Sequence, residues 1–147
     1  MSSPGMNVLV PLQTSGRGEE ALEPAADLAK WNGGKVTVLV ANDSRGERSL
    51  SEFASAERIS SGQALDRYMR QIERHLAERS VDLEVVSTPN DSAVEGAVEY
   101  AKEHDEVTAI AITEPRRLSI SERVLGSPAD KIVRNASIPV YVIPEAA

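Results

Sequence analysis

The sequence predicts an α/β protein with a doubly wound, five-stranded parallel sheet and helices on both of its faces. Short apolar runs alternate with segments of helical periodicity along the chain. Most of these runs are continuously apolar, as in strands that are buried on both faces. Alternating strands and helices require parallel strands joined by right-handed crossovers. The strand order 3-2-1-4-5 satisfies these requirements.

Five strands are expected from the apolar runs. The first covers Asn7 to Leu12, and the second, rich in β-branched residues, covers Lys35 to Ala41. The third, Asp82 to Ser87, is more polar and is therefore placed nearer a sheet edge. The fourth covers Val107 to Ile112. The fifth, Pro139 to Pro144, is bracketed by prolines.

Four helices are expected between the strands. Apolar residues recur at helical spacing from about residue 19 to residue 31 and again from about 56 to 79. A third helix covers 93–103, and a short one covers 128–135 with proline at its start. Because Pro24 falls within the first helix, it must lie in the first turn, or the helix must begin later.

Length and composition exclude several classes of protein. At 147 residues the chain is expected to form one domain, residues 1–147. Without cysteine it has no disulfide and no thiolate metal site, and its net charge of −7 argues against a nucleic-acid partner. No apolar run is long enough to cross a membrane, and the first residues lack the features of a signal peptide. We therefore expect a cytoplasmic protein.

The candidate functional loop runs from Thr113 to Ser127 and follows the fourth strand. It ends in Gly126-Ser127 at the entry to a helix. Such a pair supplies backbone N–H groups, a hydroxyl and the positive end of the helix dipole, which together can hold an anion such as phosphate. The alternative is that Ser127 is no more than the N-cap of the helix.

The expected strand order places a site at the same point. In the order 3-2-1-4-5 the winding reverses between the first and fourth strands, so a crevice opens at their carboxyl ends. Gln13 and Thr113 stand at those two ends. The candidate loop and the crevice therefore coincide.

The loop, the L-G-S helix entry and the final P-V-x-V-I strand resemble the universal stress protein family, and VLVPLQTSGRGEEALEPAADLA is similar to that family's first strand and helix. The resemblance covers nearly the whole chain. It implies the strand order 3-2-1-4-5, a site for ATP or another adenine nucleotide, and a homodimer joined through the last strand.

The chain departs from the nucleotide-binding pattern of that family. There the loop reads Gly, two residues, Gly, nine residues, then Gly-Ser or Gly-Thr. Gly126-Ser127 stand in register with the last pair, but Thr113 and Arg116 replace the first two glycines. Gln13 replaces an acidic residue that contacts the nucleoside, and an amide offers no charged acceptor. Thr113 is β-branched and tolerates positive φ poorly.

The candidate nucleotide-binding residues combine the crevice with the family register: Pro11, Gln13, Ala41, Ile112, Thr113, Arg116, Gly126 and Ser127. Two readings of Arg116 are open, because its side chain either reaches the phosphates or obstructs them. No catalytic or metal-binding constellation is found, since neither histidine has a neighbouring serine, carboxylate pair or second histidine at metal spacing. The chain is therefore expected to be no enzyme, or at most a weak ATPase.

Two functions are compatible with these observations. The first is a non-enzymatic, dimeric stress-response or regulatory module with a degenerate nucleotide site. The second is an adenine-nucleotide-binding protein that uses Gly126-Ser127 as its phosphate site. In either case we expect a homodimer through the uncharged edge formed by Val140, Tyr141, Val142 and Ile143, and an unidentified protein partner is left open.

Overall fold

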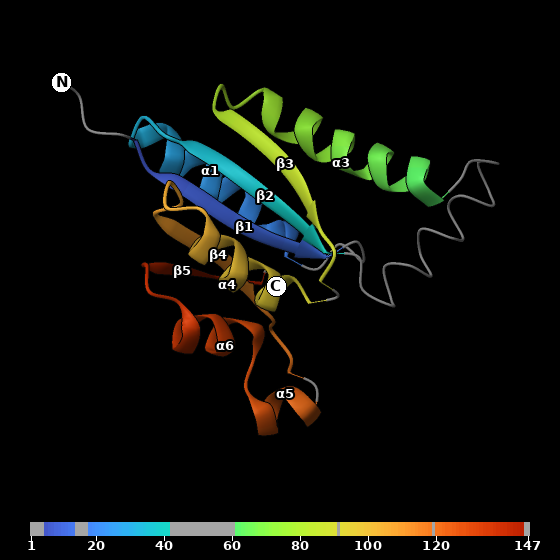
Figure 1. The fold of residues 1–147 in the computed structure, drawn as a ribbon, viewed down its shortest axis with the longest axis vertical. Helices are drawn as coiled ribbons and strands as arrows, with labels where there is room; N and C mark the ends of the chain where they lie inside the picture. The colour runs from blue at the N-terminus through green and yellow to red at the C-terminus, as the bar shows by residue number, and fades with distance from the viewer. Residues whose placement is uncertain (1–4, 14–17, 42–60, 91, 119, 146–147) are drawn as a thin grey trace.

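In the computed structural model, which describes residues 5–13, 18–41, 61–90, 92–118 and 120–145, parallel strands form one sheet of order β3-β2-β1-β4-β5 (Figure 1). The strands are β1 (Asn7–Gln13), β2 (Lys35–Ala41), β3 (Asp82–Thr88), β4 (Ala109–Glu114) and β5 (Val140–Pro144). The predicted fold class and strand order are confirmed. β3, the most polar strand, lies at one edge of the sheet as expected, and β5 lies at the other.

Helices cover both faces of the sheet. They are the 3-10 turn η1 (Glu19–Ala21), α1 (Leu22–Trp31), α3 (Ser61–Ala77), α4 (Ala93–Glu103), α5 (Ile120–Leu125) and α6 (Pro128–Asn135). α1 and α3 pack on one face, and α4 and α6 pack on the other (Figure 1). No helix in the described ranges has both the length and the apolar character that a membrane crossing needs.

Each face of the sheet has its own apolar core, because successive side chains of a strand point to opposite faces. Val8, Val10 and Leu12 of β1 pack in the core beneath α1 and α3. Leu9 of the same strand packs in the core beneath α4 and α6. This explains why β1 and β2 read as continuous apolar runs: both faces of these central strands are buried.

The fourth strand begins two residues later than predicted. The N–H of Val107 donates to the carbonyl of His104 at 3.1 Å, so Val107 still belongs to the turn after α4, although its side chain is buried. At the other end the strand continues to Glu114, and Thr113 pairs with Ile143 of β5. The apolar run therefore marks burial accurately but misplaces the strand.

Two helices also differ from expectation. α5 was predicted to be loop; it has six residues, none of them buried, so it lacks the apolar stripe by which a helix is recognised. α3 is described from Ser61 onwards, and residues 56–60 of the predicted helix lie outside the described residues. Pro24 lies in the first turn of α1, where a missing N–H costs no helical hydrogen bond.

Candidate ligand crevice

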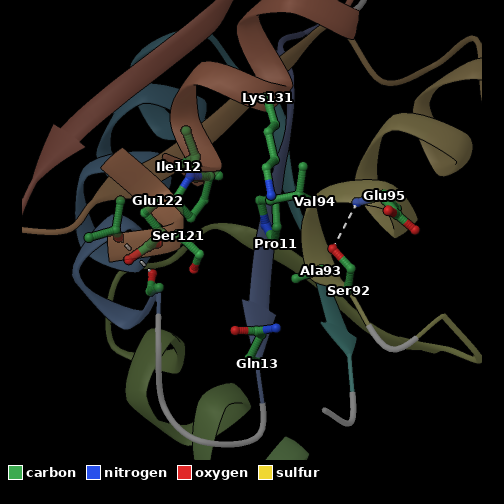
Figure 2. A pocket seen from close by; sticks show the side chains of 13 residues that line it. Pro11, Gln13, Ser92, Ala93, Val94, Glu95, Ile112, Ser121, Glu122 and Lys131 are labelled. Atoms are coloured by element: carbon green, nitrogen blue, oxygen red, sulfur yellow. Dashed lines mark hydrogen bonds between the residues drawn. The ribbon is translucent and has the colours of Figure 1, made fainter. Parts of the chain in front are cut away.

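A cavity of about 290 Å³ lies at the carboxyl ends of β1 and β4, where the winding of the sheet reverses (Figure 2). Its walls come from both strands, from the starts of α4 and α6, and from α5. The residues that line it are Pro11, Gln13, Gly18, Ser92, Ala93, Val94, Glu95, Ile112, Thr113, Ser121, Glu122, Pro128 and Lys131.

The candidate residues divide into two groups. Four of them line the cavity: Pro11, Gln13, Ile112 and Thr113. The other four lie outside the lining. Ala41 is buried at the end of β2, paired in register with Gln13, and Arg116 is exposed just after β4. Gly126 and Ser127 stand directly before Pro128, the first residue of α6 to line the cavity.

Thr113 of β4 is hydrogen-bonded to Gly18, and both residues line the cavity. Its hydroxyl donates to the carbonyl of Gly18 at 3.0 Å, and its side chain is buried. Gly18 has a φ of 108°, and a Cβ there would meet the carbonyl oxygen of Pro11 at 2.8 Å, so this position needs glycine. Thr113 itself lies in the extended backbone of β4. The expected conflict between its β-branch and a positive φ therefore does not arise.

Gly126 retains the conformation that a glycine in the loop would supply. Its φ is 100°, and its N–H donates to Glu122 at 2.8 Å at the end of α5. This turn directs the chain from α5 into α6.

Ser127 is the N-cap of α6 and forms a complete capping box. Its hydroxyl accepts from the N–H of Asp130 at 3.2 Å, and Asp130 Oδ2 accepts from the N–H of Ser127 at 3.0 Å. Hydrogen bonds with Ser127 lower the pKa of Asp130 below its ordinary value of 3.8, and the bond from the backbone N–H contributes most. A carboxylate of the protein therefore already accepts from the N–H of Ser127, and the N–H of Asp130 is satisfied by the serine hydroxyl.

A second carboxylate contacts the same serine. The Ser127 hydroxyl donates to Oε2 of Glu114 at 3.0 Å, and Ser127 is only 1% exposed. Glu114 is the last residue of β4 and is half-buried. The hydroxyl that a phosphate oxygen would contact is therefore bonded to an anion of the chain itself.

On the β1 side, Tyr68 of α3 lies close to the backbone of Gln13. The Tyr68 hydroxyl lies 3.4 Å from the Gln13 carbonyl oxygen and donates to Glu19 Oε1 at 2.8 Å. Burial first, and then this bond to Glu19, raise the pKa of Tyr68 well above its ordinary value. The hydroxyl thus ties α3 to η1, beside the end of β1.

The charged residues that line the cavity are Glu95, Glu122 and Lys131. Lys131 lies one turn into α6, and its side chain extends into the cavity (Figure 2). Within the part of the chain that the structure describes, its amino group has no hydrogen-bond or ion-pair partner. Among the described residues, the lining therefore includes one cation, from a residue that the sequence analysis did not select.

The residues that the sequence analysis missed come from α4, α5 and α6: Ser92, Ala93, Val94, Glu95, Ser121, Glu122, Pro128 and Lys131. A signal existed for two of them. Ser92 was recognisable as an N-cap, and Lys131 follows Ser127 by four residues, which places both on one face of a helix. What the sequence did not show is that α4 packs across β1 and β2, which brings Ser92 to the crevice.

No group of three or more His, Asp or Glu side chains in the described ranges could hold a metal ion. The crevice is built of hydroxyls, an amide, carboxylates and one amine, beside the apolar side chains of Pro11, Val94 and Ile112. Such a lining can bind a flat apolar group and can hydrogen-bond polar groups attached to it.

Solved structures with the same fold include nucleotide complexes. A universal stress protein in complex with cAMP has 17% identity, covers 96% of this chain and 98% of its own, and gives a TM-score of 0.66. One from Archaeoglobus fulgidus in complex with dAMP has 21% identity, coverages of 97% and 99%, and a TM-score of 0.61. One from Arabidopsis thaliana with AMP bound has 15% identity, coverages of 97% and 93%, and a TM-score of 0.64. At these identities the likeness is one of fold.

The family itself is identified by sequence. A comparison with curated proteins gives no match. The model of the universal stress protein family, in contrast, matches residues 6–144. This match spans all the strands and helices described above, from β1 to β5. The chain therefore belongs to the universal stress protein family.

Proposed function

We propose that this chain is a single-domain, non-enzymatic regulatory module of the cytoplasm that works as a homodimer and whose crevice no longer holds ATP through Gly126-Ser127. One observation carries the proposal: the hydrogen bond of 3.0 Å between the Ser127 hydroxyl and Glu114. A triphosphate at the start of α6 would have to displace this carboxylate and would meet its charge. Like charges at such short range oppose binding, the more so at a half-buried site.

Calorimetric titration with ATP tests the proposal. We expect wild-type protein to bind ATP weakly or not at all, and the Glu114→Gln variant to gain about tenfold in affinity, because the amide keeps the shape of the side chain but removes the repelling charge. Exposed Glu106→Gln, before β4, is the matched control and should change nothing. Tight ATP binding by wild-type protein, or release of phosphate from ATP above that of a blank, would contradict the proposal.

The dimer is proposed through β5, which pairs with β4 on one side only. Tyr141 is 39% exposed and Val142 46% exposed, and neither blunts this edge with a charge. An apolar cavity of about 330 Å³ lies beside the strand, lined in part by Trp31, Leu28 and Tyr141. Among the described helices, α1 packs mainly over β1 and β2 and borders this cavity rather than filling it. A second copy would pair with the edge and cover the apolar side chains.

Light scattering on a sizing column tests the dimer. Wild-type protein should elute with twice the chain mass of 15.8 kDa. Val142→Arg should shift it to monomer, because a charge at the edge opposes strand pairing. Val124→Arg on α5, an exposed valine away from the edge, is the matched control and should remain dimeric. Monomeric wild-type protein at micromolar concentration would refute this interface.

A second candidate function is adenine-nucleotide binding in the same crevice. Two observations favour it: the cavity lies at the point where the winding reverses, and relatives of the same fold were solved with cAMP, dAMP and AMP. The apolar side chains of Pro11, Val94 and Ile112 would then pack against the base. Titration with adenosine separates this candidate from the first, because adenosine carries no phosphate and does not meet Glu114.

A further inference from the structure

The charges around the crevice are unevenly placed. The start of α6 carries the carboxylates of Glu114 and Asp130, both hydrogen-bonded to Ser127. One turn further along the helix, Lys131 reaches into the cavity and has no partner among the described residues (Figure 2). The start of α6 therefore carries negative charge that repels phosphate, whereas the Lys131 amino group carries positive charge that attracts it.

This arrangement distinguishes ligands by the number of their phosphate groups. One phosphate can pair with the Lys131 amino group while its nucleoside remains on the apolar wall. A chain of three phosphates is longer and more highly charged, and carboxylates surround Lys131: Glu95 and Glu122 line the cavity, and Glu114 and Asp130 lie beyond the lining at the start of α6. A single lysine provides a charge-assisted contact for one group and does not compensate for repulsion of the others.

We infer that the crevice selects a nucleoside carrying one phosphate group over the nucleoside and its triphosphate, and that Lys131 is the residue that determines this specificity. The inference rests on the second candidate function, nucleotide binding, and adds to it the class of ligand. Its structural basis is that the anion contact has moved from the helix start at Gly126-Ser127 to a side chain one turn away.

The test is a calorimetric titration of the full chain with adenosine, AMP and ATP. AMP should bind about tenfold more tightly than adenosine, because it gains one charge-assisted contact, and about tenfold more tightly than ATP. In Lys131→Gln the affinity for AMP should fall to that for adenosine, while adenosine binding is unchanged. Exposed Lys102→Gln on α4 is the matched control and should behave as wild type.

The outcomes separate this inference from the candidate function beneath it. If adenosine and AMP bind wild-type protein equally well, or if Lys131→Gln keeps the preference for AMP, the specificity role of Lys131 is refuted and nucleoside binding stands. If Lys131→Gln weakens adenosine as much as AMP, the lysine acts on the shape of the site, and the inference fails as well. If none of the three ligands binds, both the role of Lys131 and nucleotide binding in the crevice are refuted. The first proposed function, a dimeric regulatory module, is then the one that stands.

Discussion

α4 and α6 both begin at the crevice with the pattern Ser-x-x-acid, but only α6 closes it into a capping box. In α6, Asp130 reaches back to the N–H of Ser127. In α4, that donor is already taken, because the N–H of Ser92 donates to Asn90 Oδ1 at 2.9 Å. Glu95 therefore has no reciprocal bond to Ser92 and instead lines the cavity.

This difference shows that a helix start is not by itself an anion site. The free N–H groups attract an anion only while no group of the protein satisfies them. At α6 one acid of the helix and one from β4 occupy Ser127. Gly126-Ser127 most resembles a phosphate site in the sequence, but in the structure Ser127 is hydrogen-bonded to two carboxylates of the chain itself.

The largest effect on this comparison is expected from Gly126→Ala, which breaks the turn into α6. The residue has a φ of 100°, and a Cβ there would lie 3.1 Å from Arg134 Nη2 and 3.3 Å from Asp130 Cβ. We expect a loss of about 1–3 kcal/mol in the free energy of unfolding, measured by urea titration.

Gly33→Ala is the matched control for this variant. Gly33 also has positive φ, at 65°, but no atom lies within 4 Å of the added Cβ. The control measures the cost of the backbone conformation alone, and we expect about 1 kcal/mol. If the two variants lose the same free energy of unfolding, the close contacts of the added Cβ at the start of α6 do not contribute to the destabilisation.

Replacement of the two caps compares the helix starts directly. Ser127→Ala removes the acceptor for Asp130 and the donor to Glu114, and we expect it to cost about 1–2 kcal/mol. Ser92→Ala removes a single bond of 3.3 Å to Glu95 and should cost about 0.5–1 kcal/mol. Thermal or urea unfolding of both variants gives the order. A larger loss for Ser92→Ala would reverse our account of which start is better satisfied.

The smallest effect is expected from acid. Because the folded pKa of Asp130 lies below its ordinary value of 3.8, its ionised form stabilises the fold above that value, and this contribution is lost as pH falls through the depressed pKa. Asp130→Asn lacks the contribution. Urea midpoints at about pH 6 and about pH 3 should therefore fall further in wild type than in the variant. If the urea midpoint falls by the same amount in wild type and in Asp130→Asn, a capping role for the carboxylate is ruled out.

The sequence predicted most of the fold. Continuous apolar runs in β1 and β2 indicated strands buried on both faces. The alternation of elements indicated a parallel sheet, and the family resemblance implied the strand order that the structure has. It misplaced β4 and missed α5. Val107 is apolar because it is buried in a turn, and α5 is too short and too exposed to show a periodicity.

The structure has a cavity where the sequence predicted a crevice, but the contacts around it were not predicted. Strand order alone placed the crevice beside Gln13 and Thr113, both of which line it. The sequence analysis expected the β-branch of Thr113 to conflict with a positive φ, whereas the residue is extended and its hydroxyl donates to the carbonyl of Gly18, 95 positions away in the chain. Lys131 was not selected, although its spacing of four residues from Ser127 was a signal that it lies on the same face of α6.

The sequence by itself determined the fold class and the cap at Ser127, because hydrophobic period and local hydrogen bonding act over a few residues, and the family resemblance implied the strand order. Only the tertiary structure decided what the cap contacts. Glu114 and Ser127 are 13 positions apart, and α5 and the turn at Gly126 bring the chain back so that the end of β4 meets the start of α6. A contact of that kind depends on packing across elements, and no local pattern encodes it.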